Sequence, residues 1–146
     1  MKALLQRVRE ARVTVASEVV GAIGPGLLVL VCAEPTDTPD TGRRLLAKLL
    51  KLRVFGDAAG KMNRSLQDVQ GGLLLVSQFT LAADTRGGNR PSFSGAAPPA
   101  QARALWDALQ ADALALHAPV AFGVFAADMQ VALVNDGPVT LPLSLD

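Results

Sequence analysis

The amino-acid sequence predicts an α/β fold, and two observations support this prediction. Residues 27–32 and 73–76 are apolar at every position, which is typical of central strands covered on both faces. Two further segments repeat apolar residues at helical spacing, one after Pro39 and one after Pro99. The 146 residues, of which 50% are hydrophobic and 18% charged, have the size and composition of one globular domain, residues 1–146.

The first third of the chain is expected to form strands. Residues 4–8, 13–15 and 19–23 are rich in β-branched side chains and partly alternate with polar ones. Residues 24–26, Gly-Pro-Gly, predict a turn into the apolar run at 27–32. This part of the chain is therefore predicted to consist of strands joined by turns.

Two main helices are predicted further along. Thr38 before Pro39 is typical of a helix N-cap followed by proline at the first helical position, and the leucines of residues 45–52 supply an apolar stripe. The second helix is expected to begin at Pro98-Pro99, with one apolar face that contains Ala102, Leu105, Trp106, Leu109, Ala113 and Leu116. The other expected elements are a strand at 52–55, loops at 56–63 and 82–99, strands at 119–125 and 130–134, a turn at 135–140 and a strand at 141–145.

The composition excludes several classes of function. The single cysteine, Cys32, forms no internal disulfide, which is typical of a reducing cytoplasm. One cysteine and one histidine, His117, are too few for a metal site built from these ligands. With no tyrosine and five Phe and one Trp, the chain is poorly supplied for reading stacked bases. Its longest apolar run, residues 27–33, is far shorter than the ~20 residues of a membrane span, and no export signal is expected.

A basic segment stands out in a chain whose net charge is only +1. Between Arg43 and Arg64 there are seven Lys or Arg against Asp57 alone, a local charge of +6. Such a segment is either the solvated face of a helix or a surface that contacts the phosphates of a nucleic acid. Arg86 and Arg90 in the long loop would extend the second kind of surface.

Two short motifs carry a family resemblance. One is Ser77-Gln78-Phe79-Thr80-Leu81 at the end of an apolar strand, and the other is Asn135-Asp136-Gly137-Pro138-Val139-Thr140 near the C-terminus. In this order they resemble the D-aminoacyl-tRNA deacylases (the D-tyrosyl-tRNA(Tyr) deacylase family), enzymes that remove wrongly attached D-amino acids from tRNA. The likeness extends over nearly the whole chain, through residues 1–8, 19–30, 52–63, 89–93 and 127–140.

The resemblance implies more about the fold and partners than the residue pattern alone. It implies a layered α/β/β arrangement with a mixed sheet and two main helices. It implies a cytoplasmic homodimer with active sites at the subunit interface, and no metal, cofactor or membrane. The implied partner is the acceptor end of D-aminoacyl-tRNA. The basic segment described above supplies the expected contact patch, which consists of Arg43, Arg44, Lys48, Lys51, Lys61 and Arg64.

The implied reaction is hydrolysis of the carboxylic ester that joins a D-amino acid to tRNA. The implied catalytic residues are Ser77, Gln78, Phe79 and Thr80. Backbone N–H groups at this strand end would stabilise the developing oxyanion, with the neighbouring ribose hydroxyl helping to activate water. Thr80 as a nucleophile is the competing mechanism, although it needs an activating base that the sequence does not reveal. An ordinary strand end is the structural alternative.

The resemblance assigns the second motif to chiral discrimination. It implies a cis Gly137–Pro138 bond that enters the partner subunit's pocket and is held by Arg7. Main-chain carbonyls there would collide with an L side chain, whereas D-aminoacyl and glycyl esters would pass. Phe79 and Met129 are the candidates for the terminal adenosine, with Phe125 as a further lining residue. The alternatives are an ordinary turn with a trans Gly137–Pro138 bond and, for Phe79, Met129 and Phe125, positions in the hydrophobic core.

Two other functions stay open at this point. One is a tRNA- or RNA-binding module without catalysis, which the scarce aromatics and low net charge disfavour. The other is a metabolic hydrolase for a small ester, which would not need the basic segment. An assay of ester loss from D-Tyr-tRNA and L-Tyr-tRNA separates these from a deacylase.

Overall fold

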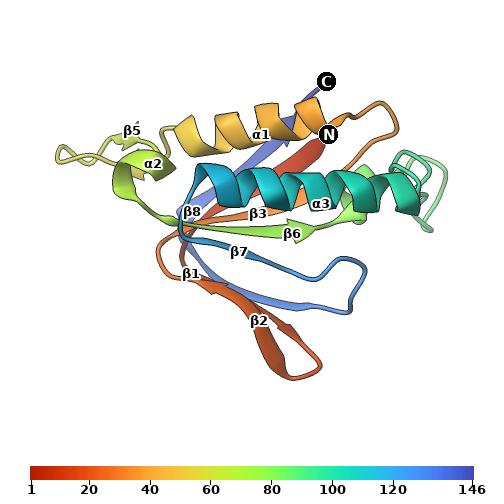
Figure 1. The fold of residues 1–146 in the computed structure, drawn as a ribbon, viewed down its shortest axis with the longest axis horizontal. Helices are drawn as coiled ribbons and strands as arrows, with labels where there is room; N and C mark the ends of the chain where they lie inside the picture. Colours follow the sequence, from red (N-terminus) through yellow and green to blue (C-terminus); the bar gives the residue numbers. More distant parts are fainter.

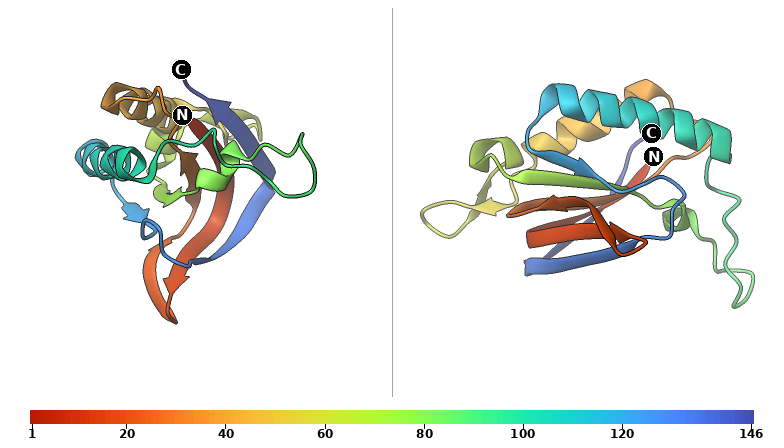
Figure 2. Two further views of the ribbon diagram at one scale, coloured as in Figure 1. Left: turned by 90° about the vertical axis from the view of Figure 1, so that its right-hand side faces the viewer. Right: turned by 60° about the horizontal axis from the view of Figure 1, so that its bottom comes forward.

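In the computed structural model, which describes residues 1–146, helices α1 and α3 lie side by side on one face of a six-stranded mixed sheet (Figure 1). Figure 2 shows the sheet curving away from the helices. The elements in chain order are β1 (Lys2–Val15), β2 (Glu18–Ile23), β3 (Gly26–Cys32), α1 (Pro39–Lys51), β4 (Phe55–Gly56), β5 (Met62–Arg64), α2 (Leu66–Val69), β6 (Gly72–Ser77), the 3₁₀ turn η1 (Phe79–Ala82), α3 (Pro99–Leu116), β7 (Val120–Phe122) and β8 (Gln130–Ser144).

Strand β1 organises the sheet because it pairs along both of its edges. On one edge its first half is antiparallel to β3 and its second half is antiparallel to β2, while β8 runs antiparallel along the other edge. Strand β6 runs parallel to β3, and β7 runs parallel to β6. The path of hydrogen-bonded neighbours is therefore β2-β1-β3-β6-β7, with β8 paired to β1 outside this path. The mixed sheet that the resemblance implied is confirmed.

The two apolar strands are covered on both faces, as predicted. Leu27, Val29 and Leu73 face the helices, within a cluster that includes the buried leucines of α1 and Trp106 of α3. Leu28 and Leu74 face the other way, in a second cluster with residues of β1 and β2. The sheet closes over this second cluster where β2 approaches β7: a Cβ added to Gly21 would lie 2.5 Å from the carbonyl oxygen of Phe122.

Both main helices begin where proline predicts. Helix α1 starts at Pro39 with Thr38 as N-cap, and the hydroxyl of Thr41 accepts a hydrogen bond from the Thr38 N–H at 3.1 Å. Its leucines are buried and its lysines and arginines face outward. Helix α3 starts at Pro99 and buries Leu105, Trp106, Leu109 and Ala113.

Other boundaries differ from the predictions. The strands expected at 4–8 and 13–15 are one continuous strand, β1, and those at 130–134 and 141–145 are joined within β8. The strand expected at 52–55 is reduced to the two-residue β4, which pairs with β5 in a hairpin across the expected loop. The short helix α2, capped by Ser65, was not predicted.

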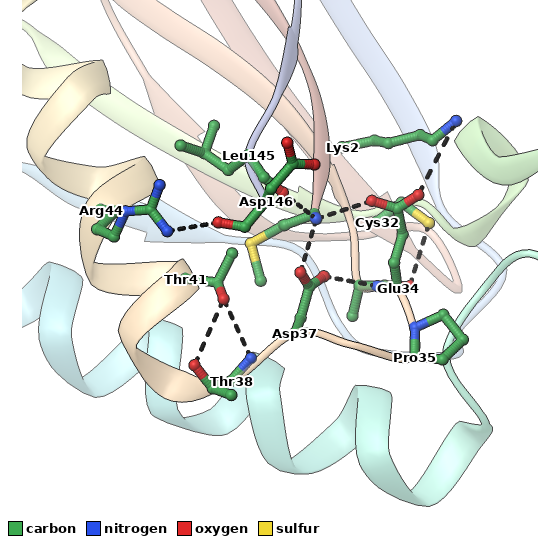
Figure 3. Close-up of polar contacts among 12 residues, drawn as sticks. Lys2, Cys32, Glu34, Pro35, Asp37, Thr38, Thr41, Arg44, Leu145 and Asp146 are labelled. Carbon is green, nitrogen blue, oxygen red and sulfur yellow. Dashed lines mark hydrogen bonds and ion pairs between the residues drawn. The ribbon is translucent and has the colours of Figure 1, made fainter.

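The amine of Met1 forms a polar cluster with Glu34, Asp37 and Leu145, the partners labelled in Figure 3. It donates to Glu34 Oε2 at 2.8 Å, to Asp37 Oδ1 at 2.7 Å and to the Leu145 carbonyl at 2.7 Å. Burial by itself lowers the pKa of this amine, but the hydrogen bonds and charges of Asp37 and Glu34 outweigh it, so the pKa is raised. The cluster ties the start of β1 to the end of β8 and to the loop before α1.

Candidate functional site

The motif Ser77–Thr80 lies where the chain leaves the sheet. Ser77 is the last residue of β6, and the Gln78 N–H makes a final hydrogen bond to the Val31 carbonyl at 2.7 Å. The chain then turns into η1, which begins at Phe79. The first N–H groups of such a turn, those of Phe79 and Thr80, have no partner within it. The motif therefore presents unpaired backbone donors, as expected from an abruptly ending strand.

The Thr80 hydroxyl has no activating base in the structure. Its partner is the side-chain amide of Gln78, whose Nε2 donates to Thr80 Oγ1. An amide N–H does not remove a proton, so this contact positions the hydroxyl without making it a nucleophile. The single histidine is elsewhere: His117 Nε2 contacts the Gly71 carbonyl at 2.7 Å, at the C-terminal end of α3. The geometry thus disfavours the nucleophile mechanism.

A largely apolar cavity of about 680 Å³ opens beside this motif. Its walls are η1, the first half of α3 and the segment between β7 and β8. Phe79 is 58% exposed at its mouth, where its ring meets that of Phe93 edge-on at 5.1 Å. Met129 and the half-buried Phe125 also line this cavity, so the three residues expected near the terminal adenosine lie around one cavity. The exposed Phe79 is not a core residue.

Two residues that contact side chains lining this cavity were not predicted. Phe93 comes from the long loop that projects beyond η1 in Figure 2, and it packs on Phe79. Arg103 of α3 lies over the ring of Phe125, with 5.4 Å between Cζ and the ring centre, and it pairs with Asp107 at 3.2 Å. No local pattern marks either residue, because each acts on a side chain more than ten positions away.

Cys32 lines the same cavity but is a buried thiol rather than a nucleophile. It is 1% exposed, and its Sγ lies 3.5 Å from the Phe79 carbonyl oxygen. Burial, with a contribution from the Glu34 charge, raises the pKa of this thiol. Because the thiolate is the reactive form, burial and a raised pKa both disfavour Cys32 as a nucleophile, in line with its apolar surroundings in the sequence.

The second motif bulges out of strand β8. Gln6 of β1 is opposite Thr140 and Val8 is opposite Asn135, so the four residues 136–139 stand opposite Arg7 alone. The Gly137–Pro138 peptide bond is cis, as the resemblance implied, and Gly137 has φ = +144°. What was expected to be a turn between two strands is therefore a large bulge within one strand, after which the pairing with β1 resumes.

Arg7 holds this bulge by hydrogen bonds from its guanidinium group. Its Nε donates to the Asp136 carbonyl at 2.9 Å, and its Nη1 donates to the Val54 carbonyl at 2.6 Å. The guanidinium thereby joins the bulge to the segment that follows α1. A cavity of about 440 Å³ lies between the bulge and the β4–β5 hairpin, with Arg7 in its lining.

The two motifs do not meet within one chain. Ser77, Gln78 and Phe79 line the larger cavity, whereas Gly137 and Pro138 line the smaller one, and no residue belongs to both. The β4–β5 hairpin beside the second cavity and the turn after β6 beside the first lie at opposite ends of the molecule (Figures 1 and 2). A site that used both motifs would need two copies of this chain.

The predicted basic patch divides between α1 and the β4–β5 hairpin. The side chains of Lys48 and Lys51 are exposed on α1 and make no ion pair or hydrogen bond. Arg43 is paired with Asp40 at 3.7 Å and with Asp112 at 3.9 Å, and Arg44 donates to the Asp146 carbonyl. Lys61 and Arg64 are exposed on the hairpin, where Arg64 Nη2 donates to the Asp68 carbonyl at 3.1 Å. The side chains of Lys48, Lys51 and Lys61 are thus the members of the patch without a partner in the chain.

The structure contains no cluster of three or more histidine, cysteine, aspartate or glutamate side chains placed to hold a metal ion. None of its helices has the length and apolar character that crossing a membrane requires.

Comparison with known proteins identifies the family. The family model described as D-Tyr-tRNA(Tyr) deacylase matches residues 4–144. A protein of Acidovorax ebreus (strain TPSY) named D-aminoacyl-tRNA deacylase is 68% identical, over 99% of this chain and 98% of the relative. A solved structure titled c-Myc DNA Unwinding Element Binding Protein is 41% identical, with a TM-score of 0.92 over 99% of this chain and 98% of the other. Another, titled as a probable eukaryotic D-amino acid tRNA deacylase, is 16% identical with a TM-score of 0.81 over 97% of both chains, a likeness of fold. The chain belongs to the D-Tyr-tRNA(Tyr) deacylase family of hydrolases.

Proposed function

We propose that this protein hydrolyses the ester bond of D-aminoacyl-tRNA in the cytoplasm, releasing a free D-amino acid and tRNA. Family membership over residues 4–144 supports the substrate class. The observation that carries the proposal is the strand end at Ser77–Thr80, where the chain leaves the sheet with unpaired N–H groups and Ser77, Gln78 and Phe79 line a largely apolar cavity. This arrangement suits an activated ester, because hydrolysis of such an ester depends more on stabilising the negative charge on the carbonyl oxygen than on a strong protein nucleophile.

The proposed chemistry uses the N–H groups of Phe79 and Thr80 as an oxyanion hole. Water attacks the ester carbonyl carbon, and negative charge develops on the carbonyl oxygen that faces these donors. The bond between this carbon and the ribose oxygen then breaks, and the ribose oxygen takes a proton as it leaves. The free ribose hydroxyl next to the ester assists water, and the terminal adenosine rests against Phe79 and Met129, with Phe125 lining the cavity.

Chiral discrimination is assigned to the bulge of β8 from a second subunit. The separation of the two motifs within one chain supports a homodimer in which Gly137–Pro138 of one copy enters the larger cavity of the other. Main-chain atoms of this bulge would occupy the space on one side of the substrate's α-carbon. An L side chain would collide with them, a D side chain would point away, and a glycyl ester would pass.

The exposed basic residues are assigned to the tRNA backbone. Lys48 and Lys51 have no partner within the chain, so they are free to neutralise phosphates. The paired Arg43 and Arg44 and the hairpin residues Lys61 and Arg64 extend this surface toward the smaller cavity. Such contacts would strengthen binding without reading the chirality of the amino acid.

One alternative deserves a direct test. The 41% identical solved structure is named for binding a DNA element, which favours nucleic-acid binding without chemistry as the second candidate. The decisive experiment incubates the protein with D-Tyr-tRNA, L-Tyr-tRNA and a small D-tyrosine ester and measures ester loss. A deacylase hydrolyses D-Tyr-tRNA and spares L-Tyr-tRNA. Binding to tRNA with no ester loss supports the binding module, and hydrolysis of the small ester alone supports a metabolic esterase.

A further inference from the structure

The bulge of β8 is too large to be held by the strand ladder. Two steps along β1, from Gln6 to Val8, correspond to five steps along β8, from Thr140 to Asn135. An ordinary β-bulge inserts one extra residue, whereas here residues 136–139 have no partner in the β1 ladder. Their backbone groups need other partners if the bulge is to keep one conformation.

Two side chains supply these partners, one on each side of the bulge. Arg7 Nε donates to the Asp136 carbonyl at 2.9 Å on the leading side. On the trailing side, Asn135 Oδ1 accepts from the Val139 N–H at 2.9 Å, and Asn135 Nδ2 donates to Thr140 Oγ1 at 2.8 Å. The side-chain amide of Asn135 uses its oxygen as the acceptor and its nitrogen as the donor. Asn135 therefore closes the neck of the bulge and leaves Gly137 and Pro138 at its exposed tip.

We propose that Asn135 is a positioning residue for chiral discrimination, and that its bonds to Val139 and Thr140 set where the Gly137–Pro138 tip lies relative to the substrate's α-carbon. This inference rests on the proposed function. It assigns Asn135 no contact with the reacting atoms. It predicts that the neck variants change the preference for D over L esters, which a residue needed only for folding would leave intact.

The test compares four variants with an unrelated asparagine. Asn135→Ala removes both neck bonds, Asn135→Asp keeps an oxygen for the Val139 N–H, Thr140→Val removes only the second bond, and Thr140→Ser keeps it. Asn89→Ala, in the exposed loop before α3, is the matched control. For each protein, kcat/KM is measured on D-Tyr-tRNA and L-Tyr-tRNA. Exchange of the Val139 amide hydrogen is followed by NMR as a readout independent of activity.

We expect Asn135→Ala to lower the D-over-L ratio by about tenfold, and Thr140→Val to lower it about threefold, in line with the net strength of the lost hydrogen bonds. Asn135→Asp should recover part of the loss, while Thr140→Ser and Asn89→Ala match the wild type. The Val139 amide should exchange about tenfold faster in Asn135→Ala.

The outcomes separate this inference from the proposed function. A wild-type protein that leaves D-Tyr-tRNA intact overturns both. An active wild type whose Asn135→Ala variant keeps the full D-over-L ratio, or the full protection of Val139, overturns the inference alone. If Asn135→Ala does not fold, Thr140→Val decides: an unchanged D-over-L ratio in this variant also overturns the inference.

Discussion

Replacing Gly137 by alanine tests whether the tip of the bulge belongs to the active site. Gly137 has φ = +144°, a conformation that L residues rarely adopt. A Cβ added there would lie 2.8 Å from Val139 Cγ2, 3.0 Å from the Val139 nitrogen and 3.2 Å from Arg7 Nη2. The Val139 backbone and the Arg7 guanidinium are both held by hydrogen bonds, so neither moves freely.

The expected penalty follows from these contacts. A non-glycine residue in such a conformation costs about 1–3 kcal/mol, and the close contact with the Val139 nitrogen adds to it. The tip is exposed and lies outside the ladder, so we expect the bulge to shift rather than the whole domain to unfold. If half or more of the penalty appears in the transition state, kcat/KM on D-Tyr-tRNA falls by about two- to a hundredfold. Glycyl-tRNA should be affected alike.

Gly88→Ala is the matched control for this substitution. Gly88 also has a positive φ, +127°, but a Cβ there meets no atom within 4 Å. It therefore has the conformational cost without the crowding and lies in the exposed loop before α3. Single-turnover deacylation and thermal unfolding are measured on both variants. Activity of Gly137→Ala within twofold of both Gly88→Ala and the wild type would refute the placement of the tip beside the substrate.

Three further predictions follow from the site and from the Met1 cluster. Thr80→Ala should keep activity within about tenfold, because Thr80 has no base; a loss of about 10⁴ in a single-turnover assay would instead indicate a nucleophile. Lys48→Ala together with Lys51→Ala should weaken tRNA binding and reduce its salt slope by about one per lysine, with D-over-L preference unchanged; an unchanged slope would mean a merely solvated helix face. The Met1 amine has its pKa raised above 8.0, so its stabilisation is complete below that pH and is lost as pH rises through the folded pKa. Thermal unfolding at neutral pH and at about pH 10 should show this loss, and Asp37→Asn should reduce it; equal pH dependence in both proteins would contradict the assignment.

The elements predicted correctly are those whose signal is local. Thr38-Pro39 and the leucine repeat define α1 because capping and amphipathic spacing act within a few residues. The apolar runs define β3 and β6 because a strand that is buried on both faces requires an apolar side chain at nearly every position. The missed helix α2 had a local signal too: Ser65 and Asp68 have capping-box spacing, and they exchange hydrogen bonds at 2.8 and 3.1 Å.

The errors in β1 and β8 arise from long-range pairing. The polar stretch at Arg9 and Glu10 interrupts the apolar alternation of β1, so the sequence predicts two strands. In the fold this stretch continues as strand because β8 runs beside it, with Glu10 opposite Val134. In the same way, residues 135–140 have the composition of a chain reversal. A bulge and a reversal need the same turn-forming residues, and only the partner strand decides between them.

The site itself shows the same division between local and distant information. The strand end at Ser77–Thr80 was predictable because an apolar run meets polar residues there. That Phe79 is exposed and meets Phe93 depends on the path of the loop between η1 and α3, which no periodicity encodes. The two motifs lie in separate cavities of one chain, although they suggest a single function when read together. Sequence order alone does not distinguish residues that meet within a subunit from residues that meet across two, because both arrangements place the same requirements on each motif. The variants of Gly137 and Asn135 address this point directly, since they perturb one cavity and are read out through chemistry proposed for the other.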